Sequence, residues 1–335
     1  MEREFDVLLL GYYGFGNLGD ELLAEAAVSL LESGGVKRER IALLSAKAAE
    51  SEKKFGLRAF DRWSLAALRR GCVSSRTLLL GGGGLFQDSS SLRSCLYYYG
   101  VMRLAKSCGC RLWAEGQSVG PLHSAAARSV TRRALSLCSR ISVRDENSAE
   151  LLSSLGLDSS FIPDLVLSLP MPKGGGDGNY ILFNARPGYE KLSRRAAESA
   201  DAFARESGRE IIGVALADED EKELERLEAL RYIKLRDIIT VRGAGDFSEA
   251  AAAASGAVGM RLHFLILSFL SGIPLAGCAY DPKVSGFCRR YGIAALDGGA
   301  LRLTTPDESA AKEAAEAVRA EFAAAVRLLT GDIDG

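Results

Sequence analysis

Histidine, paired cysteine and surplus charge are all scarce in this chain. Its 335 residues include two histidines, His123 and His263, and seven cysteines that form no Cys-x-x-Cys pair. A zinc site cannot be assembled from so few ligands, so we expect no metal. The odd number of scattered thiols excludes a disulfide framework and indicates reduced core residues in a cytoplasmic protein.

Neither a nucleic-acid partner nor a membrane span is expected. The net charge of -1 leaves no basic surplus to neutralise a run of phosphates. The longest uncharged stretch, from Leu262 to Tyr280, is interrupted by Gly272-Ile273-Pro274 and is predicted to form a helix, a turn and a buried strand. The N-terminus begins with acidic residues and lacks the pattern of a signal peptide.

What the chain does have is a repeated order of apolar strand, glycine-rich loop and helix. Apolar strands such as 6–13 and 77–86 alternate with helices such as 20–32 and 91–107, which predicts parallel sheets covered on both faces. The length is too great for one ordinary core. We predict an α/β protein of two Rossmann-like, doubly wound domains facing a cleft. Its expected parts are an N-terminal domain at 1–168, a linker at 169–179, a C-terminal domain at 180–305 and a C-terminal helix within 306–335, whose packing partner stays open.

The loop after the first strand is rich in glycine. It reads Gly14-Phe15-Gly16-Asn17-Leu18-Gly19 and matches G-x-G-x-x-G, but the acid expected after the second strand of a dinucleotide-binding unit is missing. We therefore disfavour NAD or FAD. The glycines would let the backbone approach a ligand at a helix N-terminus, with Asn17 and Asp20 bonding sugar hydroxyls. The alternative is a tight turn in which Asp20 caps the helix.

Two further loops follow later strands. Gly82 and Gly83 belong to a run of four glycines, which a plain turn would not need. We expect them to allow close approach to a ligand or to the other domain. Gln117 follows another strand, in a loop where its side chain points either to the cleft or away from it.

Two arginines are predicted at strand ends, one in each domain. Arg144 ends the strand ISVR, and Arg186 follows the strand YILFNA. A planar guanidinium in a cleft suits an anion, so both are predicted to bind substrate. The alternative for each is a salt bridge, for Arg144 with Asp145 or Asp164.

The segment Gly259 to His263 carries the most specific combination of groups. It lies where a strand ends and an apolar helix begins, so free N–H groups and a positive dipole end face an incoming anion. Arg261 adds a charged fork, and His263 can exchange a proton near pH 7. Lys283 follows the next strand, where it can reach the same site or lie at the surface.

These motifs together resemble the polysaccharide pyruvyl transferase family, in particular its bacterial branch linked to surface-layer anchoring. The segments that carry the resemblance are GYYGFGNLGDE, LLLGGGGLFQD, GQSVGPL, SVRDENS, GMRLHFLILS and GIPLAGCAYDPKV, from Gly11 to Val284. The resemblance implies a glycosyltransferase B-like fold and transfer of pyruvate from phosphoenolpyruvate to two hydroxyls of one sugar, with release of phosphate.

The resemblance also implies roles for particular residues. Arg261 and His263 fall on the family's phosphoenolpyruvate-binding and catalytic pair, Leu262 lies between them in the same substrate-binding segment, and Lys283 falls on the family's lysine. Phosphoenolpyruvate is then a co-substrate, and no cofactor is expected. His263 is our candidate for proton transfer, with Arg261, Lys283 and Arg186 holding phosphate and carboxylate.

The acceptor implied by the bacterial branch is an N-acetylmannosamine-containing sugar on a polyprenyl diphosphate. Such an acceptor would bring the enzyme to the inner face of the cytoplasmic membrane, where Leu65, Leu68, Arg69 and Arg70 could touch lipid; a core-packed helix face explains these residues equally well.

Two other functions stay open. One is a nucleotide-sugar glycosyltransferase or epimerase of the same fold, and the other is a non-catalytic carbohydrate-binding protein.

Overall fold

The computed structural model describes residues 3–89, 91–174, 178–296 and 300–330. Contacts divide the chain into two units. The first contains residues 1–15, 23–169 and 315–335, and the second contains 16–22 and 170–314. Parts of all four predicted segments lie outside the described residues: 1–2 and 90 of the N-terminal domain, 175–177 of the linker, 297–299 of the C-terminal domain and 331–335 of the terminal helix.

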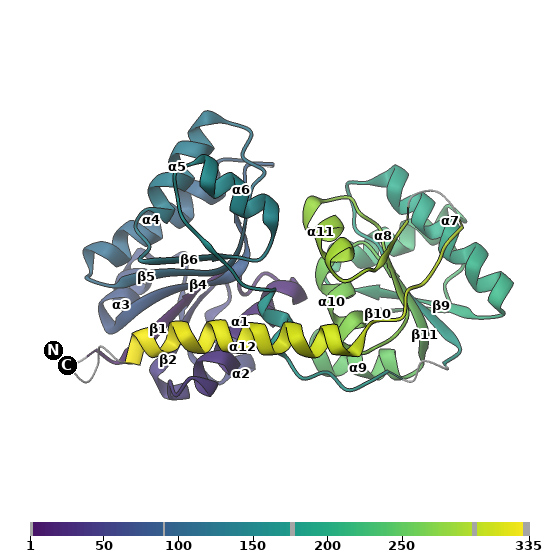
Figure 1. The fold of residues 1–335 in the computed structure, drawn as a ribbon, viewed down its shortest axis with the longest axis horizontal. Coiled ribbons are helices and arrows are strands. Elements are labelled where there is room, and N and C mark those ends of the chain that lie inside the picture. The colour runs from purple at the N-terminus through teal and green to yellow at the C-terminus, as the bar shows by residue number, and fades with distance from the viewer. Residues whose placement is uncertain (1–2, 90, 175–177, 297–299, 331–335) are drawn as a thin grey trace. The chain divides into compact units, whose positions relative to one another are not determined.

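The first unit is built on a parallel sheet (Figure 1), in which the described residues form seven strands in the order β3-β2-β1-β4-β5-β6-β7. The strands are β1 (Phe5–Leu10), β2 (Ile41–Ser45), β3 (Arg58–Asp61), β4 (Ser75–Phe86), β5 (Arg111–Val119), β6 (Arg140–Val143) and β7 (Ser160–Phe161). The connecting helices are α1 (Leu18–Ser33), α2 (Ala48–Phe55), α3 (Leu65–Ser74), α4 (Arg93–Ser107), α5 (Ala125–Leu135) and α6 (Glu146–Ser154).

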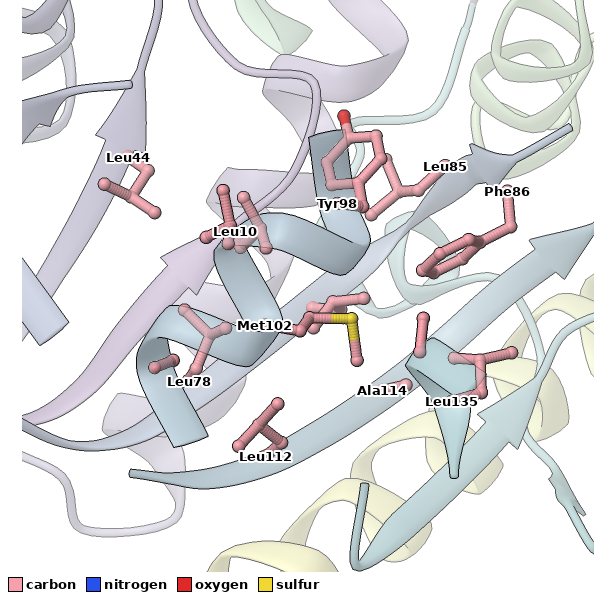
Figure 2. Packing of buried hydrophobic residues seen from close by; sticks show 14 of the residues in the cluster. Leu10, Leu44, Leu78, Leu85, Phe86, Tyr98, Met102, Leu112, Ala114 and Leu135 are labelled. Atoms are coloured by element: carbon pink, nitrogen blue, oxygen red, sulfur yellow. The ribbon is translucent and has the colours of Figure 1, made fainter. Parts of the chain in front are cut away.

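Burial on both faces of the central strands explains their unbroken apolar sequences. The apolar side chains of β1 and the leucines of β4 are almost wholly shielded from water. Figure 2 shows Tyr98 and Met102 of α4 packed over Leu78, Leu112 and neighbouring strand residues in one continuous core. Helices α3, α5 and α6 contribute residues to the same core.

The second unit repeats the pattern in six strands among its described residues, in the order β10-β9-β8-β11-β12-β13. The strands are β8 (Tyr180–Asn184), β9 (Glu210–Ala215), β10 (Asp237–Thr240), β11 (Ala254–Gly259), β12 (Leu275–Gly277) and β13 (Ala294–Ala295). The helices are α7 (Glu190–Ser207), α8 (Asp218–Ala229), α9 (Ala244–Ala252), α10 (Leu262–Leu270) and α11 (Pro282–Arg290). Helix α12 (Glu308–Thr330) begins in this unit, but its residues from 315 onward belong to the first unit. Alanines of α7 and leucines of α8 pack with β8 and β9 in its core.

Both sheets therefore have the Rossmann strand order. In this order the first three strands are added toward one edge of the sheet, and the fourth strand returns to pair with the other side of the first. In the second unit this change of direction, the switch point, lies between β8 and β11. The prediction of two doubly wound α/β domains is confirmed, while the cleft between them stays a prediction. None of the helices within the described residues is long and apolar enough to cross a membrane.

Candidate active site

The switch point of the second sheet gathers most of the predicted site residues. Parallel strands present their carboxyl ends at one edge, where ligands of such sheets bind. Arg186 follows β8, Arg261 and His263 follow β11, and Lys283 follows β12. These three strands are neighbours in the sheet, so their loops lie at adjacent places on that edge.

Arg261 is the N-cap of α10, and its backbone N–H donates to Asn184 Oδ1 at 3.0 Å. Its side chain is held by carboxylates: Nε donates to Asp220 Oδ2 at 2.7 Å, and Nη2 donates to Asp220 Oδ1 and Glu219 Oε1, each at 2.5 Å. Burial opposes the charge of Arg261, but hydrogen bonds to Asp220 and Glu219 outweigh it and raise the pKa of the guanidinium. Arg261 is thus a fixed cation already matched by acids.

His263 is the second residue of α10 and contacts the glycine-rich segment of α1. A Cβ built on Gly19 would lie 2.1 Å from Nδ1 of His263, so only glycine leaves room for the imidazole here. The segment 16–22 belongs to the second unit, and the N–H of Leu18 donates to the carbonyl oxygen of Leu216 at 2.9 Å. Two motifs separated by more than 200 residues in sequence therefore meet at His263.

Asn17, rather than Asp20, caps helix α1. The Oδ1 atom of Asn17 accepts a hydrogen bond from the N–H of Gly19 at 3.1 Å. Asp20 is the third residue of the helix and is half-buried. The suggestion that Asp20 caps this helix is therefore wrong, and sugar binding by either residue stays a prediction.

Arg186 differs from Arg261 because no carboxylate of the described residues pairs with it. Its Nη1 donates to the hydroxyl of Tyr280 at 2.8 Å, and its guanidinium lies over the rings of Tyr280 and Tyr189 at 4.9 and 5.5 Å from their centroids. Its Nε is buried with no hydrogen-bond partner among those residues. Burial raises the pKa of Tyr280, so the tyrosine stays neutral beside this cation.

Lys283 and Leu262 both lie in the first turn of a helix at the same sheet edge. Lys283 is the half-buried second residue of α11, whose cap Asp281 accepts from the Lys283 N–H at 2.8 Å. Leu262 is the half-buried first residue of α10. Both positions agree with the strand-loop-helix arrangement predicted for these segments.

Several predicted site residues of the first unit make contacts within that unit, and their binding of substrate stays a prediction. Gly82 and Gly83 lie inside β4, with φ values of +85° and +93°, and a Cβ on Gly82 would come within 2.9 Å of Leu23 Cδ2. The expectation that the glycines form a loop is wrong, because the strand continues through them to Phe86. Close approach to another part of the fold is what the structure shows for Gly82.

Gln117 and Arg144 also take part in internal contacts. Gln117 lies within β5 rather than in a loop, fully buried, and its Nε2 donates to the carbonyl oxygens of Leu80 and Glu115, both at 3.1 Å. Arg144 donates to Asp164 Oδ2 at 2.5 Å and to Ser118 Oγ at 2.8 Å. The salt bridge left open for Arg144 is thus present.

Sequence reasoning missed Glu219, Asp220, Asn184 and Tyr280. The two acids open the helix DEDEKELERLEA, whose charge suggests a solvated surface helix. Asp220 is nevertheless fully buried, because Arg261 and the Leu216 N–H both approach it. No signal in the sequence separates Asp220 from its exposed neighbours, whereas Asn184 and Tyr280 could have been noted as polar residues at strand ends.

Comparison with known families identifies the family of this chain. The sequence model described as polysaccharide pyruvyl transferase matches residues 17–282, which include Arg186, Arg261 and His263. The chain belongs to the polysaccharide pyruvyl transferase family. The match begins at Asn17 and ends one residue before Lys283, so the family assignment does not depend on that lysine.

Solved structures similar to this pyruvyl transferase family member share its glycosyltransferase B-like fold. The UDP-GlcNAc 2-epimerase from Methanocaldococcus jannaschii is 9% identical, with 97% of this chain and 99% of that chain covered at a TM-score of 0.58. A putative UDP-N-acetylglucosamine 2-epimerase from Listeria monocytogenes is 13% identical, with coverage of 96% and 90% and a TM-score of 0.58. A glycosyltransferase from Rickettsia africae is 9% identical, with coverage of 100% and 98% and a TM-score of 0.54. The comparison with curated proteins gave no match.

Proposed function

We propose that this enzyme transfers the pyruvyl group of phosphoenolpyruvate to two hydroxyls of one sugar as a cyclic ketal. The observation that carries the proposal is the meeting of His263 with Gly19 beside a helix start that bears Arg261. A proton-transfer group, a helix N-terminus and a guanidinium at one sheet edge suit an enol phosphate.

The residues supply what such a reaction needs. A proton is added to the methylene carbon of phosphoenolpyruvate, and a sugar hydroxyl attacks C2. The C2–O bond to phosphate then breaks, and a second hydroxyl closes the ketal on C2. The methylene gains one hydrogen, the two hydroxyls lose one each, and the other leaves on hydrogen phosphate, so no oxidant or cofactor is required. His263 moves the proton, while Arg186 and Lys283 attract phosphate and carboxylate.

Arg186 is the best-supported anion ligand of the second unit. Its guanidinium is positioned by Tyr280 and is not matched by a carboxylate of the described residues. An incoming phosphate or carboxylate would therefore add the missing negative charge without displacing an acid.

The acceptor is proposed to be an N-acetylmannosamine-containing sugar on a polyprenyl diphosphate, used at the cytoplasmic face of the membrane. Leu65 is 72% exposed on α3, and Arg69 and Arg70 are exposed on the same helix, which supports contact with an anionic lipid surface. Leu68 does not join them, because it packs in the core.

The test measures phosphate release from phosphoenolpyruvate with and without that lipid-linked acceptor, for the wild type and His263→Ala. Release that depends on the acceptor and disappears in the variant is expected. Absence of release with any acceptor, together with saturable binding of a uridine diphosphate sugar, would reject the proposal in favour of a nucleotide-sugar enzyme. Full activity of His263→Ala would remove the histidine from the reaction.

A further inference from the structure

The two carboxylates on Arg261 are held in very different ways. Asp220 is fully buried, and its side chain accepts from Nε and Nη2 of Arg261 and, at 3.1 Å, from the N–H of Leu216. The side chain of Glu219 is 56% exposed and reaches only Nη2 of the same guanidinium. One residue of α8 thus forms a buried anchor, and its neighbour forms a contact at the edge of solvent.

The energetic consequences of losing these two contacts differ. Separation of Asp220 from Arg261 would leave an uncompensated charge in the protein interior, which is strongly unfavourable. Separation of Glu219 returns a solvated carboxylate to water, and exposed pairs of this kind contribute little stability. An anion that approaches Arg261 would therefore replace Glu219 and leave Asp220 in place.

The donor geometry of Arg261 agrees with this division. The Nε and Nη2 groups point at the carboxylates, and Nη1 has no hydrogen-bond partner among the described residues. An anion held by Nη1 and Nη2 can use both terminal nitrogens of the fork only if Glu219 leaves Nη2.

Resting on the proposed function, we propose that Asp220 is a positioning residue that fixes the guanidinium of Arg261 for the substrate, and that Glu219 is a displaceable carboxylate. An anionic group of the substrate exchanges with Glu219 at Nη2. Asp220 and Glu219 together determine how firmly the enzyme holds an anion. Asp220 sets the orientation of the Arg261 guanidinium, and Glu219 competes with the anion for Nη2.

The Glu219 part is tested by calorimetric titration of the wild type, Glu219→Gln and Glu225→Gln with phosphoenolpyruvate, inorganic phosphate and UDP. Glu225 is the matched control, because it is exposed on the same helix and forms no side-chain hydrogen bond or ion pair with a described residue. We expect Glu219→Gln to bind phosphoenolpyruvate and phosphate about fivefold more tightly than the wild type, with Glu225→Gln within about twofold of it.

Equal affinity of Glu219→Gln and the wild type for every anion that binds would overturn the inference. Binding of UDP without binding of phosphoenolpyruvate or phosphate would reject the proposed function alone. In that case tighter UDP binding by Glu219→Gln still supports displacement, and unchanged UDP binding overturns it. If the wild type binds none of the three probes, no anion competes with Glu219 and the inference is wrong.

The Asp220 part is tested by Asp220→Asn, which keeps the size of the side chain and removes its charge. If Asp220 positions the guanidinium of Arg261, the variant should still bind phosphoenolpyruvate with a calorimetric stoichiometry near one and an affinity no weaker than that of the wild type. Its kcat should be lowered about tenfold or more. Wild-type kcat would overturn the role. Should the variant fail to melt cooperatively, Arg261→Lys is the second variant, because lysine keeps the charge but loses the fork. Wild-type kcat in that variant would likewise overturn the inference.

Discussion

Replacement of Gly19 by alanine should disable the enzyme without unfolding it. The new Cβ would stand 2.1 Å from Nδ1 of His263, and ordinary contacts begin at 3.4 Å, so the imidazole must retreat by the difference of about 1.3 Å. A misplacement of about 1 Å at a reacting group can lower the rate about a hundredfold, so we expect a loss of kcat of that order. The assay is acceptor-dependent phosphate release from phosphoenolpyruvate.

The stability of the variant should change little. Gly19 lies in the first turn of α1 without a positive φ, and alanine is favoured over glycine in a helix interior by about 1 kcal/mol. Urea unfolding should therefore give a free energy within about 1 kcal/mol of the wild type. The matched control is Gly100→Ala in α4, where a Cβ meets nothing within 4 Å, and this variant should keep full activity.

A double-mutant cycle separates the histidine from other effects. In a His263→Ala background there is no imidazole to displace, so the further change Gly19→Ala should not lower the residual rate. The reasoning is refuted if folded Gly19→Ala keeps a kcat within about threefold of the wild type, against the hundredfold loss expected. It is also refuted if the two losses simply multiply.

Three further predictions concern stability and thiol chemistry. Gly82→Ala should lower the free energy of unfolding by about 2 kcal/mol or more in urea titrations, because φ is +85° and Leu23 lies 2.9 Å from the new Cβ. Arg144→Met should cost about 3–5 kcal/mol by the same assay, since it removes the guanidinium that balances the charge of the buried Asp164 carboxylate, and Asp164→Asn should restore part of the loss. Burial raises the pKa of Cys278 to about 12, so little of the reactive thiolate is present at pH 8. Alkylation of Cys278 at pH 8, followed by mass spectrometry, should therefore be about a thousandfold slower in the folded than in the unfolded protein. Equal rates would contradict the burial of this thiol.

The sheets could be predicted from the sequence because their central strands are buried on both faces. Strands such as β1 and β4 are largely continuous apolar runs, which is typical of parallel strands covered by helices on both faces. The short strand β3 was missed, because its sequence RAFD has exposed charged ends and only two buried residues. The strand predicted at 77–86 agrees closely with β4, but the sequence did not show that the strand pairing continues through glycines with positive φ.

The site could be predicted only as far as its strand ends. The rule that ligands bind at carboxyl ends placed Arg186 and Arg261 at one sheet edge, because both follow neighbouring parallel strands. It could not reveal which side chains accept hydrogen bonds from these arginines. The partner of Arg261 lies in a helix whose charge pattern suggests solvent, and the partner of Arg186 is a tyrosine across the sheet edge. These choices depend on tertiary contacts that no local pattern encodes.

The charges around Arg261 also bear on which anions the enzyme prefers. If the proposed function holds, Arg186 would attract an anion without competition from a carboxylate of the described residues, whereas an anion at Arg261 would have to displace Glu219. A doubly charged phosphate ester gains more from the two arginines than a monoanionic carboxylate does, while both must displace the same glutamate. Because the cost of displacing Glu219 would be the same for each anion, it would weaken their binding equally and leave the preference between them unchanged. We therefore expect the two arginines, and not Glu219, to favour substrates with a dianionic group, which a phosphate ester supplies near neutral pH.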